Sequence, residues 1–248
     1  MLIVANWKAY VEDLARAKKL VALGKKLARA DKVSVVLAPP APLLSVLSIG
    51  SKTGVAFAAQ DVSATAGGAH TGEGTAQAFA AAGATYALVG HSERRAAGDT
   101  DAVVAEKLAR ALAQDLVPVL CVGEKERDGE GRYLARIREE IVTALEPLEL
   151  RERARVIIAY EPLWAIGKDA SAAISANDLA EMTLYIRKVL AELLSGRNAG
   201  RTTVLYGGAV EPENIRDLAA DAGVDGFLIG HASADPAVFA AFAKNLAA

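Results

Sequence analysis

Residues 156–164 read Val-Ile-Ile-Ala-Tyr-Glu-Pro-Leu-Trp, an apolar run followed at once by a carboxylate and a proline. The run is apolar at consecutive rather than alternate positions, which is typical of a strand buried on both faces of a parallel sheet. Ligand-binding groups of parallel sheets lie at the carboxyl ends of such strands. The stretch therefore predicts a buried parallel strand followed by a candidate functional residue, Glu161.

The same kind of run recurs along the whole chain. Eight short segments are rich in Val, Ile, Leu and Ala: Leu2–Ala5, Val33–Ala38, Val55–Ala59, Tyr86–Val89, Val117–Val122, Val156–Tyr160, Thr203–Tyr206 and Gly226–Ile229. Successive segments start 22 to 47 residues apart. That spacing leaves room for a right-handed crossover helix between each strand and the next.

Amphipathic segments with helical periodicity lie between the apolar runs. They include Leu14–Ala30, Asp101–Gln114, Arg132–Glu146, Ala176–Leu194 and Pro212–Ala222. Eight β-then-α units in about 250 residues predict an α/β fold, a closed (β/α)8 barrel with eight parallel strands. An open doubly wound sheet is the alternative, because strand count alone does not establish closure. No linker or shift of composition divides the chain, so we expect one domain spanning residues 1–248.

The composition excludes several classes of protein. The 248 residues include 28 Lys plus Arg against 30 Asp plus Glu, a net charge of −2, and no basic patch, so we expect no nucleic-acid partner. The longest uncharged stretch, Val33–Ser51, is broken by prolines, so no membrane-spanning helix is expected. The first residues, 1–8, carry no basic leader, and we expect a cytoplasmic protein.

The cysteine and histidine content argues against a disulfide or a metal site. Cys121 is the one cysteine, and His70, His91 and His231 do not have the spacing of a zinc site. We therefore expect neither a structural disulfide nor a bound metal.

Polar residues directly follow several of the apolar runs. Asn6 and Lys8 follow the first, His91 the fourth and Glu161 the sixth. In a barrel these ends meet at one rim, which would gather a carboxylate, an imidazole and an amine there. Each residue alone also has an ordinary structural interpretation: a surface lysine, a hydrogen-bonded histidine, a salt-bridged carboxylate. For Arg95, which ends the charged run 93–95, we keep the interpretation of a solvated charge.

Two glycine sites suit an anion. Gly207-Gly208 follows the seventh apolar run, and Gly230 follows the eighth. Glycines there allow backbone N–H groups to approach a phosphate closely. The chain contains no Walker or Gly-x-Gly-x-x-Gly pattern, which weakens a nucleotide-binding interpretation. The small-residue segment 164–173, which contains Gly167, predicts a loop that opens and closes.

Taken together, these residues resemble the triosephosphate isomerase family. Five segments carry the resemblance in family order: Asn6-Trp7-Lys8, Gly90-His91-Ser92-Glu93-Arg94-Arg95, Cys121-Val122-Gly123-Glu124, Ala159-Tyr160-Glu161-Pro162-Leu163-Trp164-Ala165-Ile166-Gly167 and Tyr206-Gly207-Gly208. They span essentially the whole chain. The resemblance implies an isomerase of glycolysis and gluconeogenesis that interconverts glyceraldehyde 3-phosphate and dihydroxyacetone phosphate without a cofactor.

The resemblance also implies roles for single residues. Glu161 would be the base, and His91 would polarise the carbonyl oxygens. Lys8 would stabilise the enediolate and the phosphate and would pair with Glu93 between turnovers, while Asn6 would orient the carbonyl. The implied phosphate-binding residues are Gly167, Gly207, Gly208, Ala209, Gly230 and His231. The segment 67–73 resembles a protruding loop that reaches a second subunit through Thr71 and Glu73, which implies a homodimer.

The chain departs from the family pattern at three places. Ala209 stands where the family usually has a serine, and His231 where it usually has a second glycine. His231 is compatible with that site if its φ angle is negative. Residues 168–172 differ from the usual lid hinge, and residues 174–178 are expected to lengthen the run before the next helix. We expect the reaction type to be retained with altered kinetics.

Two other functions compete with this interpretation. One is an isomerase or aldolase acting on another phosphorylated sugar, but none of the eight apolar runs carries a mid-strand lysine for a Schiff base. The other is a non-catalytic paralogue that binds a phosphorylated metabolite. Loss of Lys8, His91 or Glu161 would have favoured it, and all three are present.

Overall fold

The structure is a computed structural model, and it describes residues 1–29, 33–49, 54–166, 174–194 and 201–246. Eight strands form a closed barrel in chain order, which confirms the predicted barrel and excludes the alternative of an open sheet. The strands are β1 (Leu2–Asn6), β2 (Ser34–Ala38), β3 (Ala56–Ala59), β4 (Tyr86–Val89), β5 (Val117–Val122), β6 (Ile157–Tyr160), β7 (Val204–Tyr206) and β8 (Gly226–Ile229). Every neighbouring pair is parallel, and Leu2 of β1 lies opposite both Ser34 of β2 and Gly226 of β8. Each strand lies within one residue of its predicted limits.

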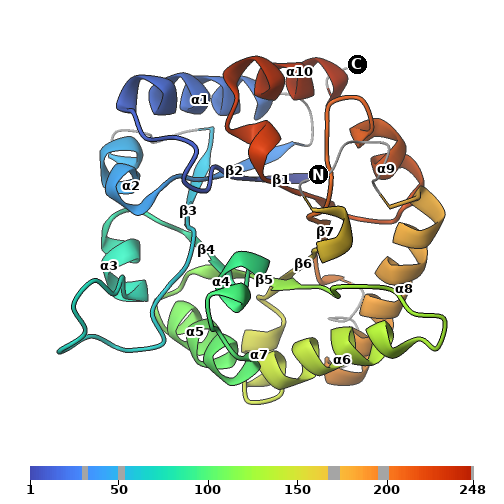
Figure 1. Ribbon diagram of the computed structural model, residues 1–248. Coiled ribbons are helices and arrows are strands. Elements are labelled where there is room, and N and C mark those ends of the chain that lie inside the picture. The colour runs from blue at the N-terminus through green and yellow to red at the C-terminus, as the bar shows by residue number, and fades with distance from the viewer. Residues whose placement is uncertain (30–32, 50–53, 167–173, 195–200, 247–248) are drawn as a thin grey trace.

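Helices surround the barrel, as Figure 1 shows in a view along its axis. The α-helices are α1 (Leu14–Leu27), α2 (Ala41–Ser48), α3 (Ala76–Ala81), α4 (Ser92–Ala96), α5 (Asp101–Ala113), α6 (Arg132–Leu145), α7 (Leu150–Arg153), α8 (Ala176–Leu193), α9 (Ile215–Asp221) and α10 (Pro236–Leu246). Short 3₁₀ helices, η1 (Leu163–Ala165) and η4 (His231–Ser233), follow β6 and β8. No helix in the described residues is both long and apolar enough to cross a membrane.

Local sequence explains where the helices begin. Asp13, Thr75, Thr100 and Ser175 each cap a helix by accepting a hydrogen bond from the backbone N–H three residues on. The proline run of 39–42 marks the boundary between β2 and α2, where Pro42 fits the first turn because that turn needs no N–H donor. Helix α9 begins at Ile215 rather than at the predicted Pro212. The side chain of Asn214 there accepts a hydrogen bond from the Glu211 N–H and donates one to the Ala209 carbonyl, which holds residues 211–214 as a turn.

Alternate residues of each strand enter two separate apolar clusters. Val4, Leu88, Val119 and Leu205 belong to the smaller cluster, which fills the barrel. Their neighbours along the strands, such as Ile3, pack in the larger cluster between the strands and the helices. Both faces of each strand are therefore buried, which is why the runs are apolar at consecutive positions.

Candidate active site

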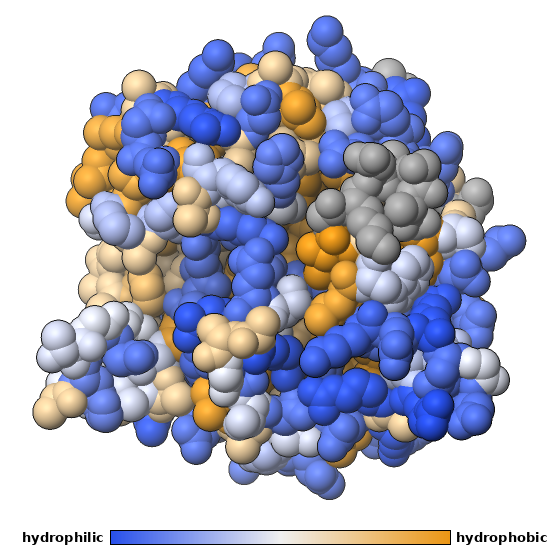
Figure 2. Space-filling view, in the orientation of Figure 1, coloured by the Kyte–Doolittle hydropathy of each residue, from blue (hydrophilic) through white to orange (hydrophobic). Residues whose placement is uncertain are grey.

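The carboxyl ends of the strands surround a cavity of about 370 Å³. Nine of the predicted site residues line it: Asn6, Lys8, His91, Glu161, Gly207, Gly208, Ala209, Gly230 and His231. They follow or end β1, β4, β6, β7 and β8, so the predicted convergence on one rim is confirmed. Hydrophilic residues gather around the centre of this face of the barrel (Figure 2). The tenth residue predicted for the active site, Gly167, lies outside the described residues, as do residues 168–173 of the predicted lid.

Lys8 is held in the cavity by contacts to its backbone and its side chain. Its φ angle is +47°, a left-handed conformation that costs a non-glycine residue about 1 kcal/mol or more. The Lys8 N–H donates to Asn6 Oδ1 at 3.0 Å, and the Lys8 carbonyl accepts from Gln60 Nε2 at 2.9 Å. Its ammonium lies 2.7 Å from Glu93 Oε1, as predicted. Burial alone would raise the pKa of Glu93, but the hydrogen bond and charge of Lys8 outweigh it and lower that pKa.

The imidazole of His91 faces the carboxylate of Glu161. His91 Nε2 lies 3.4 Å from Glu161 Oε1. On the other side of the ring, Nδ1 accepts a hydrogen bond from the Glu93 N–H at 3.2 Å, as the N-cap of α4. A nitrogen that accepts carries no proton, so in the neutral ring the proton is on Nε2, the atom that faces the cavity. This arrangement makes His91 a neutral hydrogen-bond donor.

Glu161 is 2% exposed and lies where two glycines leave room for it. Its Oε2 accepts a hydrogen bond from the Ser92 N–H at 3.2 Å. A Cβ atom at Gly207 would lie 3.0 Å from Glu161 Cγ, and one at Gly123 only 1.8 Å from the Glu161 carbonyl oxygen. The position of the carboxylate therefore depends on the absence of side chains at both neighbours.

The loops after β7 and β8 differ in which backbone groups are free. The Gly207 N–H donates to the Tyr160 carbonyl at 2.8 Å, so in this structure it is used within the sheet rather than offered to the cavity. Within the described residues, no acceptor is bonded to the Gly208 N–H. The Ala209 carbonyl is fixed by Asn214. Gly230 lies close to Lys8, since a Cβ there would be 3.4 Å from Lys8 Cε.

His231 occupies its site without backbone strain. Its φ angle is not in the positive range, which meets the condition stated for a side chain at this position. The ring packs edge-on against Tyr10, with centroids 5.0 Å apart and planes at 83°. The imidazole therefore stands at the rim of the cavity beside Gly230.

A second group of residues, missed by the sequence analysis, supports the segment after β6. Glu124 is 2% exposed, and its Oε1 accepts from the Tyr160 hydroxyl at 2.7 Å and from Trp164 Nε1 at 2.9 Å. The Arg127 guanidinium donates to both Glu124 and Tyr160 and lies 5.4 Å from the centroid of the Trp164 ring. The start of the predicted lid is thereby anchored. Residues 174–178 do not lengthen the run before the next helix as expected, because Ser175 caps α8 and residues 176–178 form its first turn.

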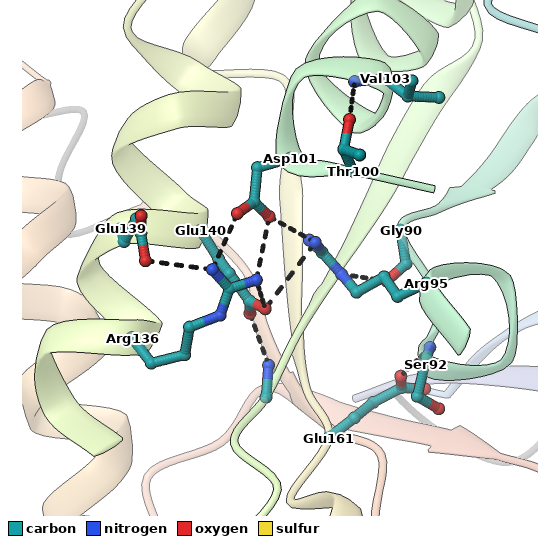
Figure 3. Close-up of polar contacts among 11 residues, drawn as sticks. Gly90, Ser92, Arg95, Thr100, Asp101, Val103, Arg136, Glu139, Glu140 and Glu161 are labelled. Atoms are coloured by element: carbon teal, nitrogen blue, oxygen red, sulfur yellow. Dashed lines mark hydrogen bonds and ion pairs between the residues drawn. The ribbon is translucent and has the colours of Figure 1, made fainter. Parts of the chain in front are cut away.

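Arg95 is not the solvated charge that we expected. Its side chain is 16% exposed, its Nε donates to the Gly90 carbonyl at 2.8 Å, and its Nη1 pairs with Asp101. Glu140, from α6, lies close by (Figure 3). The partners of Arg95 are the Gly90 carbonyl and carboxylates of two later helices, and nothing in the charged run 93–95 identifies them.

The segment 67–73 projects from the body of the barrel between β3 and α3, as the teal loop in Figure 1 shows. Thr71 and Glu73 are exposed and do not line the cavity. Gly67, Gly68 and Gly72 have positive φ angles, which suits the tight course of the loop. In the described part of the chain, no three His, Cys, Asp or Glu side chains are grouped so as to hold a metal ion.

Comparisons with known proteins agree with this geometry. The family model described as triosephosphate isomerase matches residues 1–246. Curated proteins named triosephosphate isomerase include one from Mycobacterium avium, 39% identical over 253 residues, which cover 98% of this chain and 95% of that protein. Another, from Thermus thermophilus, is 38% identical over 247 residues, 98% of each chain, and one from Cupriavidus pinatubonensis is 41% identical over 234 residues, 94% of each. The chain belongs to the triosephosphate isomerase family.

Proposed function

We infer that the chain is a triosephosphate isomerase, which interconverts D-glyceraldehyde 3-phosphate and dihydroxyacetone phosphate and so serves glycolysis and gluconeogenesis. The observation that carries this conclusion is the cavity in which His91 Nε2 faces Glu161 Oε1 at 3.4 Å with the Lys8 ammonium on the same rim. A base, a neutral donor and a fixed cation are what proton transfer next to a carbonyl requires. Proton transfer of this kind moves hydrogen within one substrate molecule and requires no redox cofactor.

The proposed reaction runs through an enediolate. The Glu161 carboxylate removes a proton from C1 of dihydroxyacetone phosphate, and the electron pair of that C–H bond moves toward the carbonyl oxygen. The Nε2–H of His91 passes its proton to the oxygen at C2, and Nε2 takes up the hydroxyl proton of the oxygen at C1, so that one proton is transferred from the first oxygen to the second and the imidazole is restored. Return of the proton from Glu161 to C2 completes the aldose, and the reverse sequence regenerates the ketose.

Lys8 and Asn6 complete the proposed catalytic set. The ammonium of Lys8 would stabilise the negative charge of the enediolate and the phosphate, since a fixed charge in a partly dry site is worth more than in water. In the free enzyme that ammonium is neutralised by Glu93 at 2.7 Å. Binding of an anionic substrate would draw Lys8 from Glu93. Asn6, which fixes the Lys8 backbone through Oδ1, retains an amide N–H₂ group to orient the carbonyl.

The phosphate is proposed to bind at the loops after β7 and β8. The candidate donors are the Gly208 N–H, which has no acceptor within the described residues, and the adjacent Ala209 and Gly230 backbone, with Gly207 supplying space and His231 a side-chain contact at the rim. Gly167 is proposed to add an N–H from the lid, as the family resemblance implies. Exclusion of water by such a lid would prevent elimination of phosphate from the enediolate.

We further propose that the chain folds as one domain and acts as a cytoplasmic homodimer. The protruding loop 67–73 supports the homodimer, because its exposed Thr71 and Glu73 make no use of the cavity of their own subunit. Sedimentation or light scattering tests the assembly. A monomer with full activity would contradict it.

A coupled assay of glyceraldehyde 3-phosphate conversion tests the reaction. We expect rapid turnover by the wild type and a loss in kcat of at least about 10²–10⁴-fold in Glu161→Gln, the usual contribution of a general base. Glu106→Gln is the matched control, because Glu106 is an exposed carboxylate on α5 that lies outside the cavity. Folded wild type that binds a phosphorylated triose without converting it would favour the non-catalytic alternative.

A further inference from the structure

One ion cluster lies behind the active site and joins three helices. We define the cluster as Arg95 of α4, Asp101 of α5, and Arg136 and Glu140 of α6. Figure 3 shows the four side chains pointing toward one another, with Glu161 and Ser92 to one side. The four also line a second cavity of about 660 Å³ that reaches Glu161 from behind. The cluster therefore lies between the helices and the catalytic carboxylate.

The charges within the cluster balance. Two guanidinium groups face two carboxylates, and Asp101 accepts hydrogen bonds from both Arg95 and Arg136. Arg136 Nη2 also donates to Glu140 Oε1 at 2.8 Å, and Arg95 Nη1 lies 3.7 Å from the same oxygen. Burial raises the pKa of Glu140, and the charge of Arg95 and the Gly123 N–H oppose that rise. Glu140 is 2% exposed, so it depends on these partners rather than on water.

Besides the ion pair of Arg136 with the exposed Glu139, the cluster makes two hydrogen bonds to the backbone, and each lies beside a proposed catalytic residue. Arg95 Nε donates to the carbonyl of Gly90, the residue before His91, at 2.8 Å. Glu140 Oε2 accepts from the N–H of Gly123 at 2.8 Å. Gly123 packs so tightly against Glu161 that a Cβ there would lie 1.8 Å from the Glu161 carbonyl oxygen.

Neither contact is part of regular secondary structure. Gly90 has a φ angle of +73°, and Gly123 directly follows β5, so both are points where the chain leaves the barrel. A backbone that leaves a strand needs a partner to define its course. Here the partner is a charged side chain in each case, and charge-assisted hydrogen bonds are the stronger kind.

We propose that Glu140 and Arg95 are positioning residues for the isomerase reaction: Glu140, through Gly123, fixes the backbone of the base Glu161, and Arg95, through Gly90, fixes that of His91. The proposal rests on the proposed function of the site. The separation of base and donor is then set by one rigid cluster rather than by two independent loops. An error of about 1 Å in such a separation costs about 10²-fold in rate.

The first test compares two substitutions of Glu140. Glu140→Leu removes the acceptor of the Gly123 N–H, whereas Glu140→Gln retains an amide oxygen that can accept it. We expect Leu to lower kcat by about tenfold or more and to change KM less than about threefold, because Gly123 does not line the cavity that the phosphate loops line. Gln is expected to recover most of kcat. Glu139→Leu is the control, since Glu139 also pairs with Arg136, at 3.0 Å, but its side chain is 63% exposed.

A second measurement separates positioning from a general loss of structure. The inhibition constant of inorganic phosphate reports the phosphate loops and Lys8, whereas a phosphorylated hydroxamate that mimics the enediolate also requires Glu161 and His91 in place. Glu140→Leu should weaken the hydroxamate in parallel with kcat and leave inorganic phosphate unchanged. Parallel weakening of both inhibitors would mean that Glu140 only supports the fold, and would overturn the proposal.

Arg95→Lys keeps the proposal testable if Glu140→Leu does not fold. Lysine supplies a cation for Asp101, but one ammonium does not reproduce the separate Nε contact with Gly90. We expect a loss of about fivefold or more in kcat with little change in KM. If the wild type is active and neither Glu140→Leu nor Arg95→Lys lowers kcat, this inference is overturned and the proposed function is not. An inactive wild type would instead overturn the proposed function.

Discussion

Gly123→Ala adds one methyl group, and the structure predicts that this small change lowers activity strongly. The added methyl group would lie 1.8 Å from the carbonyl oxygen and 2.7 Å from the carbonyl carbon of Glu161. Real Cβ atoms essentially never approach another heavy atom closer than 3.0 Å. Because both atoms that clash belong to the backbone, no side-chain rotation relieves the contact. The backbone of Glu161 must therefore move by more than 1 Å relative to Gly123.

The size of that movement sets the expected magnitudes. A misplacement of about 1 Å costs about 10²-fold in rate, so we expect kcat to fall by about 10²-fold or more. Overpacking of this kind costs about 1–3 kcal/mol of stability, less than the roughly 5–15 kcal/mol typical of a folded domain. The variant should therefore fold and yet be a poor catalyst. KM should change little, because Gly123 lies outside the cavity that holds the phosphate loops.

The assay is steady-state turnover of glyceraldehyde 3-phosphate together with urea unfolding of each variant. Gly129→Ala serves as the control, since a Cβ at Gly129 meets no atom within 4 Å and its φ angle is not in the positive range. It should leave kcat within about twofold of the wild type. A folded Gly123→Ala variant with wild-type kcat would refute the view that this close approach positions the base.

Three further predictions concern stability. Lys107→Met should lower the free energy of unfolding by about 3–5 kcal/mol in urea, because the buried ammonium of Lys107 holds the carboxylates of Asp61 and Asp99 at 2.7 and 2.6 Å; a loss below about 1 kcal/mol would contradict this. Leu205→Ala, inside the barrel, should cost about 2–5 kcal/mol by the same measurement, and a smaller loss would mean that the barrel interior collapses around the space. Burial raises the pKa of Asp101, but hydrogen bonds from Arg136 and Arg95 outweigh it and lower that pKa below its value in the unfolded chain. Asp101 therefore stabilises the fold above about pH 4, and this contribution is lost as the pH falls through its folded pKa. In Asp101→Asn, the free energy of unfolding should therefore depend less on pH in the acid range than it does in the wild type.

The barrel and its rim could be predicted because their signals are local in the sequence. Consecutive apolar residues such as those of 157–160 indicate a strand that is buried on both faces. Because all the strands are parallel, the residues directly after each run lie at the same end of the barrel. Asn6, Lys8, His91 and Glu161 were found in this way, and the structure brings all four to one cavity. The pairing of Lys8 with Glu93, implied by the family resemblance, is also present.

The residues that support the site could not be predicted, because their partners lie in other elements of the fold. Arg95 bonds to a carbonyl five residues earlier and to Asp101 on another helix, and nothing in the charged run distinguishes it from a solvated side chain. Glu124 gains its role only when Tyr160 and Trp164 are folded against it. The use of the Gly207 N–H within the sheet likewise follows from strand register rather than from sequence.

Solvent-deuterium incorporation during turnover in D₂O tests the central claim most directly. If Glu161 carries the proton between C1 and C2, its carboxyl exchanges with solvent, and product formed in D₂O should contain deuterium at C1 of dihydroxyacetone phosphate or at C2 of glyceraldehyde 3-phosphate. Glu161→Gln should slow that incorporation by about 10²-fold or more, while Glu106→Gln leaves it unchanged. Conversion without any deuterium in either product, or incorporation at the wild-type rate in Glu161→Gln, would contradict the account.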